Sequence, residues 1–407
     1  DGALVHYPYY AFLLGDMHSY FMSIPFQLAY IALILALYLK SRTGIPFNRS
    51  DMLLTVFVLS VSLGFFFILN TWDYPTYIIF TISAFVLLRI WSRVRWNFII
   101  PVAIAVLSFI LYLPYYLAGR MSGFAGIGLL HSDLRTSVAE LLEFCAPFLL
   151  IIGTFLLILL KQEALYSKKA VIVAISIFIA VVMVSIFCHF QLLLLVVPIG
   201  LISLSAVFAP KMQPEKKFLL LLIIMAMALA FFCDFAYIDD VFTGVWERFN
   251  TIIKLYSQLW IFLSLAAVYA VYAILNYWIK VCGKEKVLKV SWIGLLSVVL
   301  VAALIHPVVS TVSTTSGRDT SWQLNRGTLD GMAYIEAVNQ GDYEAINWLN
   351  RNIDGTPVIL EAPGDPNGYS SIISSFTGLP TVIGWQTYEI VWRQDWDAVY
   401  NRSIEAD

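Results

Sequence analysis

A carboxylate and an imidazole stand where the chain first enters a long apolar segment. Asp16 and His18 are two residues apart and directly precede the apolar stretch 21–39. Ionisable groups at the edge of a membrane segment are costly to bury and often mark function. A carboxylate there can act as general base toward an acceptor hydroxyl, while the imidazole can orient it, bind phosphate or ligate a metal. The alternative is that both side chains only cap a helix, whose first turn favours aspartate.

A second carboxylate, Asp73, follows the next apolar stretch. It lies in the turn 70–76, which reads Asn-Thr-Trp-Asp-Tyr-Pro-Thr. The Asn, Asp and Pro residues explain a tight turn without any function. If the first two membrane helices pack as an antiparallel pair, however, Asp73 lies near Asp16. We therefore take Asp16, His18 and Asp73 as the candidate catalytic residues.

Cationic side chains suited to a phosphate follow in the segment 247–256. If this segment is helical, residues 247, 250, 251 and 254 share one face, with residue 248 one step round. Arginine and lysine beside a membrane surface, opposite acidic residues, suit a lipid-linked phosphate. The candidate ligands of a donor phosphate are Arg248, Lys254, Glu247 and Asn250. The alternative is an interfacial amphipathic helix whose charges are simply solvated.

Polar, aromatic and glycine residues gather again near the end of the chain, after two predicted strands. Loops at the ends of parallel strands are common ligand sites. Trp385 and Trp392 can stack on a sugar ring, and Arg393 can bind an anion. The candidate residues for binding sugar or acceptor are Glu361, Tyr369, Trp385, Glu389 and Arg393. The alternative is that these side chains only pack a small domain.

The histidines and cysteines do not form a metal-binding pattern. His189 and His306 each end an apolar stretch, and no second histidine stands at the spacing of a ligand pair. The four cysteines show no CxxC spacing. We therefore expect neither a haem nor a fixed metal cage, and a divalent cation such as Mg²⁺ or Mn²⁺ stays open as a cofactor.

The elements that must position these residues are membrane helices. The 407 residues are 60% hydrophobic and only 13% charged, and the mean hydropathy is +0.80. This composition excludes an ordinary soluble protein and predicts an α-helical polytopic membrane protein. Stretches of about 17 to 25 apolar residues are long enough to cross a bilayer. Ten such stretches are predicted, at 21–39, 52–69, 77–94, 97–117, 138–160, 170–188, 191–209, 218–233, 257–279 and 290–308.

The distribution of basic residues predicts the orientation. The loops after the first, third, fifth, seventh and ninth stretches hold sixteen of the 25 lysines and arginines. Basic loops stay on the cytoplasmic side. The Asp16 segment, the 70–76 turn, the 247–256 segment and the chain beyond residue 310 are therefore expected on the extracytoplasmic face of the cell membrane.

Composition changes sharply after the tenth stretch. We expect a membrane domain at 1–309, a polar linker at 310–329 and a small extracytoplasmic α/β domain at 330–407. Its predicted elements are a helix at 343–352, a strand at 357–360, a helix near 369–376, a strand at 380–383 and a further segment at 386–393. The chain opens without an initiator methionine or signal peptide and stops soon after a motif-like stretch, so we expect truncation at both ends.

Several separated blocks resemble the YYY family of uncharacterised bacterial and archaeal polytopic membrane proteins, which is grouped with the GT-C glycosyltransferases. They occur in order across nearly the whole chain. The blocks are 15–18 with Pro25 and Phe26, 70–76, 247–254, 328–331, and 375–381 with Gly384, Trp385, Glu389, Trp392 and Arg393. The resemblance implies a GT-C-like membrane domain whose active site faces outward, with an essential carboxylate in the first outer loop and an extracytoplasmic C-terminal domain.

The expected function is therefore transfer of a sugar from a polyprenyl-phosphate-linked donor to a glycan, protein or lipid acceptor, with inversion. In this hypothesis Asp16, helped by His18 or Asp73, activates the acceptor, while Arg248 and Lys254 hold the donor phosphate. Two alternatives stay open: a transporter, which needs ionisable groups in mid-membrane, and a non-catalytic scaffold or glycan-binding protein. The bilayer is an expected partner and nucleic acid is not.

Overall fold

The computed structural model describes residues 8–15, 17–43, 48–91, 98–118, 126–163, 168–209, 212–240, 242–280, 286–315, 328, 330–364, 368–393 and 395–406. The chain divides into two compact units. The first comprises residues 1–119 and 126–305, and the second comprises residues 120–125 and 306–407.

The described residues contain seven helices that are long and apolar enough to cross a membrane. These helices are α3 (Ile24–Arg42), α4 (Arg49–Leu69), α5 (Asp73–Trp91), α8 (Val138–Glu163), α11 (Pro214–Phe235), α12 (Phe249–Lys280) and α13 (Lys286–Thr315). The other three predicted stretches coincide with shorter apolar segments, Ile99–Leu111, Ile172–Phe187 and Leu193–Val207. They belong to α6 (Ile99–Leu111), α9 (Lys168–Phe187) and α10 (Leu193–Val207). The chain is thus a polytopic α-helical membrane protein, as composition predicts.

Prolines and a left-handed turn account for the shorter helices. Pro114 cannot donate a backbone hydrogen bond, so α6 stops and a separate short helix, α7 (Leu113–Ala118), begins beside it. His189 has φ of 50°, in the left-handed region, and turns the chain sharply between α9 and α10. Further short elements are α1 (Pro8–Leu14), α2 (Ser19–Met22) and the 3₁₀ turns η1 (Ser132–Leu134) and η2 (Gly244–Trp246).

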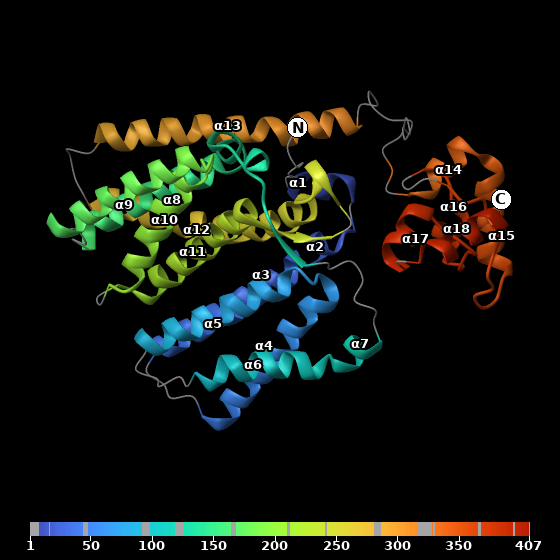
Figure 1. The fold of residues 1–407 in the computed structure, drawn as a ribbon, viewed down its shortest axis with the longest axis horizontal. Helices are drawn as coiled ribbons and strands as arrows, with labels where there is room; N and C mark the ends of the chain where they lie inside the picture. The colour runs from blue at the N-terminus through green and yellow to red at the C-terminus, as the bar shows by residue number, and fades with distance from the viewer. Residues whose placement is uncertain are drawn as a thin grey trace. The chain divides into compact units, whose positions relative to one another are not determined.

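Helix α11 is the centre of the first unit. It packs against α10 on one side and α12 on another, and it also contacts α3 and α5 (Figure 1). Interlocked aromatic rings fill the interior between α3, α4, α5 and α12, with Tyr30, Phe66, Tyr77, Phe80 and Phe262 almost fully buried. The Tyr30 hydroxyl lies 2.6 Å from Thr81 Oγ1, so this buried polar group is satisfied.

Helices α4 and α6 approach each other closely at Gly64. A Cβ atom added there would lie 2.5 Å from the Ser108 carbonyl oxygen and 2.3 Å from the Tyr112 ring. Only glycine lets the two backbones come so near, which is a common device where membrane helices pack. In contrast, α9 and α13 expose most of their large apolar side chains, as lipid-facing helices do.

A short antiparallel pair joins the segment before α8 to the segment after α11. Strand β1 (Gly126–Leu129) pairs with β2 (Ala236–Asp239), with Gly128 opposite Tyr237. Residues 119–125, directly before β1, lie outside the described residues. This pairing joins the segment that precedes α8 to the segment that precedes α12.

The second unit is mostly helical, with α14 (Met332–Val338), α15 (Gln340–Asn352), α16 (Ile372–Thr377), α17 (Gln386–Arg393) and α18 (Trp396–Ala406). The two predicted strands meet in parallel only at an isolated bridge, Ile359 with Thr381, and a second parallel bridge, Gly364 with Trp385, lies beyond their predicted ends. The Ile359 N–H donates to Pro380 O at 2.8 Å, and the Val382 N–H donates to Ile359 O at 3.1 Å. Because proline has no N–H to donate, Pro380 limits this pairing.

Candidate functional site

The carboxylate of Asp73 is enclosed by side-chain amides from three parts of the chain. Asp73 is fully buried. Its Oδ1 accepts hydrogen bonds from Asn70 Nδ2 at 2.8 Å and from Gln258 Nε2 at 2.7 Å. Its Oδ2 accepts one from Gln27 Nε2 at 3.1 Å, and the Tyr77 hydroxyl donates to Gln27 Oε1 at 2.9 Å. We call these five residues the Asp73 cluster.

The local sequence explains how a carboxylate can be buried here. Asp73 is the first residue of α5, where the helix dipole favours negative charge. Its N–H donates to the Asn70 carbonyl at 2.9 Å, which closes the turn from α4 into α5. Pro75 falls within the first helical turn, where a missing N–H costs nothing. The dipole and the amide donors together offset the desolvation of the carboxylate.

Lys254 lies beside this cluster. It stands one helical turn before Gln258 on α12, so both side chains are on the same face. The Lys254 ammonium is 4.8 Å from the centre of the Trp72 ring, an attractive cation–π distance. The turn that carries Asp73 therefore also presents an aromatic face to a half-buried cation.

Gln258 retains an unused acceptor. Its amide nitrogen donates to Asp73 and, at 3.3 Å, to the Trp72 carbonyl oxygen. Its amide oxygen, Oε1, is buried and has no hydrogen-bond partner among the described residues. A buried acceptor of this kind is costly unless a donor reaches it. A hydroxyl group of a bound molecule would meet that need.

Arg248 is committed to a different interaction. Its guanidinium pairs with Asp234 Oδ1 at 2.9 Å, and both side chains are almost completely buried. The same Nη1 atom lies 3.2 Å from Thr136 Oγ1, and the Thr136 N–H donates to Asp234 Oδ1 at 3.0 Å. Removing one member would leave the other charge buried and unpaired, so this triad ties α8, α11 and α12 together rather than facing a ligand.

The two remaining predicted phosphate ligands also have partners within the protein. Asn250 Nδ2 donates to Asp240 Oδ2 at 2.8 Å. Glu247 directly follows η2, before α12 begins, and interacts with Tyr237. Burial and the Glu247 carboxylate raise the pKa of Tyr237. Of the four residues predicted for the donor phosphate, Lys254 is thus the one that lies beside the Asp73 cluster.

The first predicted block approaches the same region. Asp16 lies outside the described residues. His18 directly precedes α2 and is exposed, with its ring 5.8 Å from that of Tyr20. Helix α2 contacts α4 and α12, the helices that flank Asn70 and Lys254. The helix that follows the first block therefore contacts α4, which leads into the 70–76 turn, and α12, which carries Lys254.

The predicted residues of the second unit separate into two groups. Tyr369 donates from its hydroxyl to Asp342 Oδ2 at 2.8 Å. Burial, together with this hydrogen bond, raises the pKa of Tyr369 to about 12. Glu361 Oε2 accepts from the Ile373 and Ser374 N–H groups at 3.2 and 3.4 Å, while Glu361 Oε1 is buried without a partner among the described residues.

Gly384 and Trp385 follow the second bridged segment. The Trp385 indole N–H donates to the Ser370 carbonyl oxygen at 3.0 Å. A Cβ atom added at Gly384 would lie 3.5 Å from Glu389 Oε1 and 4.0 Å from Ser371 Oγ. Ser371 is buried, has a left-handed φ of 61°, and its hydroxyl has no partner among the described residues. Strain and an unused hydroxyl at one position are typical of functional loops.

Glu389 and Arg393 form an ion pair along α17 and line a cavity of about 380 Å³. Arg402 and Asp395 line it as well, so the cavity has a mixed charged wall. The side chain of Trp392 lies outside the described residues. Glu389, Arg393 and the Gly384 turn are therefore brought together, whereas Tyr369 is directed to Asp342.

No group of three or more histidine, cysteine, aspartate or glutamate side chains is placed to hold a metal ion within the described part of the chain. Asp16 is not in that part. The divalent cation stays an open prediction.

Residues 1–263 match a family described as "Uncharacterized membrane protein (DUF2298)". The chain belongs to this family. No curated protein and no solved structure matches it. The part matched to DUF2298 includes Asp16, His18, the whole Asp73 cluster and Lys254, and it ends before residues 306–407 of the second unit.

Sequence reasoning did not select Gln27 and Gln258, which bond Asp73, or Asp234, which pairs with Arg248. Each is a polar residue within or at the end of an apolar helix, which is itself a signal because such residues need buried partners. What the sequence does not reveal is the partner. Asp234 pairs with Arg248 because β2 and η2 reverse the chain between them.

Proposed function

We propose that this DUF2298 protein is a membrane glycosyltransferase of the GT-C type. It transfers a sugar from a polyprenyl-phosphate-linked donor to an acceptor at the extracytoplasmic face of the cell membrane. The observation that carries the proposal is Lys254, a half-buried cation held against Trp72 and one helical turn from the Asp73 cluster. A fixed cation at a membrane-helix end suits a lipid phosphate.

The proposed reaction is a direct displacement. The acceptor oxygen attacks the anomeric carbon of the sugar, and the bond from that carbon to the phosphate oxygen breaks. The acceptor proton passes to a carboxylate, and the polyprenyl phosphate leaves with its added negative charge. Lys254 stabilises that charge as it develops.

The enclosure of Asp73 favours a positioning role for this residue. Both of its oxygens accept hydrogen bonds from amides, and no part of it is exposed. It fixes Gln258, whose free amide oxygen is available to a sugar hydroxyl. Asp16, aided by His18, is the proposed acceptor base. Arg248 supports this arrangement through its pair with Asp234.

The second unit carries the residues that we propose bind a sugar or an acceptor. Close to the turn at Gly384 are Trp385, Glu389 and Arg393. Glu361 lies earlier in the chain, and Tyr369 is hydrogen-bonded to Asp342 on α15. Mixed acidic, basic and aromatic side chains suit a carbohydrate or a polar polymer. A non-catalytic lipid- or glycan-binding protein is the competing proposal, favoured by the full enclosure of Asp73.

Mass spectrometry of lipids that copurify with the full chain tests the proposal. The transferase should retain a polyprenyl-phosphate sugar, and Lys254→Gln should lose most of it. Lys216→Gln is the matched control. It removes a positive charge from the first turn of α11, and this variant should retain the lipid. Absence of any such lipid, together with tight glycan binding, would favour the binding protein.

A further inference from the structure

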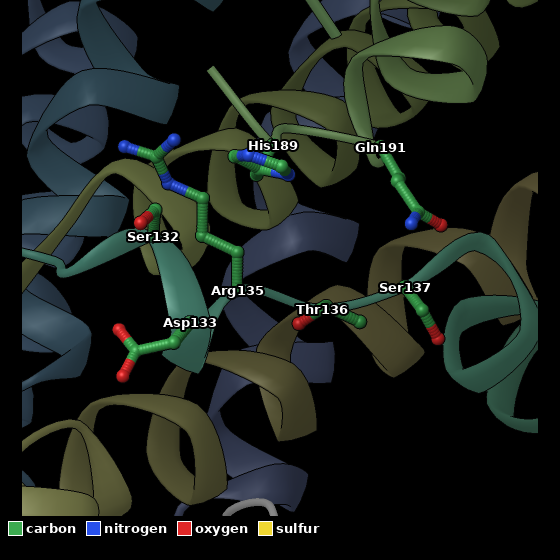
Figure 2. Close-up of a pocket in the computed structure, with 7 residues that line it drawn as sticks. All are labelled: Ser132, Asp133, Arg135, Thr136, Ser137, His189 and Gln191. Atoms are coloured by element: carbon green, nitrogen blue, oxygen red, sulfur yellow. The ribbon is translucent and has the colours of Figure 1, made fainter. Parts of the chain in front are cut away.

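A cavity of about 390 Å³ opens between the start of α8 and the turn joining α9 to α10. Its lining residues are Ser132, Asp133, Arg135, Thr136, Ser137, His189 and Gln191 (Figure 2). It shares no lining residue with the Asp73 cluster or Lys254. Nothing in the proposed transfer reaction uses it.

Arg135 is held at this cavity by two contacts of its guanidinium group. Its guanidinium lies 4.6 Å from the centre of the Phe190 ring, and its Nη1 donates to the Cys188 carbonyl oxygen. Its Nε is buried and has no hydrogen-bond partner among the described residues. The side chain is therefore fixed in place while a charged donor remains unused. A guanidinium in this state suits an oxyanion.

Neutral donors complete the lining. Gln191 Oε1 accepts from the Val138 N–H at 3.4 Å, which leaves the amide nitrogen of Gln191 as a donor. In Figure 2 the Gln191 side chain extends from the α9–α10 turn toward the segment that carries Thr136 and Ser137. The Ser137 hydroxyl accepts from Glu140 N–H at 3.2 Å and keeps its own proton to donate.

The carboxylates near Arg135 interact with other groups or point away from its guanidinium. Asp133 interacts with His131, and Figure 2 shows its carboxylate pointing away from the Arg135 guanidinium. Glu140 accepts from the Ser137 N–H at 2.6 Å. Asp234, behind Thr136, is neutralised by Arg248. Arg135 thus provides positive charge that these groups do not cancel directly.

The cavity lies at the ends of apolar helices. The candidate span Ser132–Gln162 begins at its wall, α9 ends just before His189, and α10 begins just after Gln191. Beside it, Ile186 and Phe187 are 63% and 75% exposed, as side chains that contact acyl chains would be. A phosphate placed here would sit at the depth of lipid head groups, with hydrocarbon beside it.

We propose that this cavity binds the phosphate group of a membrane lipid, with Arg135 as the charged ligand and Gln191 and Ser137 as neutral donors. The acyl or prenyl chain runs along the exposed apolar side chains of α9. The proposal stands whether or not the protein transfers sugar.

Native mass spectrometry of the full chain tests it with phosphatidylglycerol as the probe. The decisive variant is Gln191→Glu, because a glutamate oxygen can still accept from Val138 N–H while a carboxylate replaces the donor that faces the phosphate. We expect about tenfold weaker retention of phosphatidylglycerol, the size of effect that a charge-assisted hydrogen bond has. Gln213→Glu, an exposed glutamine at the start of α11, is the matched control and should bind as the wild type does.

Arg135 variants separate charge from geometry. Arg135→Gln should lose binding, and Arg135→Lys should recover part of it, because lysine keeps the charge but not the planar fork. Equal retention by the wild type and Gln191→Glu would overturn the proposal. So would equal retention of a phosphate-free galactolipid. Complete displacement of the lipid by inorganic phosphate would show instead that the cavity takes the free ion.

Discussion

Gln258 donates a 2.7 Å hydrogen bond to Asp73 across a sequence separation of 185 residues. This bond joins α12 to the turn between α4 and α5, and it sets the position of Lys254 one turn away. Gln27 on α3 reaches the other oxygen of the same carboxylate. A single buried aspartate at the start of α5 therefore links α3, α5 and α12.

Replacing Gln258 with leucine should destabilise the protein. The Asp73 carboxylate would lose one of its amide donors while staying buried, and a hydrogen bond to a charged group contributes about 1.5–3 kcal/mol. Thermal unfolding of the purified protein in detergent measures this. Gln340→Leu, which removes a hydrogen bond on the exposed surface of α15, should change stability by less than about 0.5 kcal/mol. Equal effects of the two changes would show that the Asp73 cluster adds no stability.

Breaking the Arg248–Asp234 pair should have a larger effect. Arg248→Met leaves a buried unpaired carboxylate, for which the cost is about 3–5 kcal/mol. The double variant Arg248→Met with Asp234→Asn should recover part of that loss, because the uncompensated charge is gone. Arg351→Met, at an exposed site, is the control. A fully stable Arg248→Met protein would return Arg248 to the set of residues available to a ligand.

The contact between α4 and α6 predicts opposite effects of one substitution at two glycines. Gly64→Ala forces a Cβ against the Ser108 backbone oxygen, and overpacking of this kind costs about 1–3 kcal/mol. Gly153→Ala on α8 meets no atom within 4 Å and should stabilise the protein by about 0.5–1 kcal/mol through helix propensity. Melting temperatures of the two variants measure the difference. A stabilised Gly64→Ala variant would be incompatible with the close packing.

The stability of the second unit should fall at high pH because of Tyr369. An unfolded tyrosine ionises near the ordinary pKa of 10.0, whereas in the folded protein the pKa of Tyr369 is raised to about 12. Folded Tyr369 therefore contributes stability that is complete below pH 10 and is lost as pH rises through about 12. Unfolding of the full chain followed by tryptophan fluorescence, with Tyr369→Phe for comparison, measures this. The phenylalanine variant should lose less stability over that pH range; identical pH profiles would contradict the assignment.

Hydropathy predicts the membrane helices well because lipid imposes one requirement on length and polarity. Within the described residues, seven of the ten predicted stretches coincide with helices long enough to cross a membrane, and the other three coincide with shorter apolar helices. The stretch 97–117 is divided at Leu111 because a proline follows, and α11 and α12 extend well beyond the predicted ends. The predicted strands 357–360 and 380–383 do meet in parallel, yet each contributes only an isolated bridge between residues.

The candidate site was predictable as a set of blocks and not as a set of contacts. Spacing on one helix face correctly associates Asn250, Thr251 and Lys254 on α12, but it cannot show that Asn250 bonds Asp240 and Thr251 bonds the Ile238 N–H. Arg248 looks available in sequence because its partner Asp234 belongs to another helix. Contacts between helices decide which basic side chain is left to bind a ligand, and the spacing of residues along one helix does not reveal those contacts.

The most direct test of the account is sugar transfer by the full chain in proteoliposomes that contain a labelled polyprenyl-phosphate sugar and an acceptor. Removing one preorganised donor to a developing oxyanion lowers turnover by about 10²–10³-fold. We predict transfer by the wild-type protein, a loss of this size in Lys254→Gln, and normal transfer in Lys216→Gln. Transfer by Lys254→Gln at the wild-type rate, or no transfer by the wild-type protein, would contradict the account.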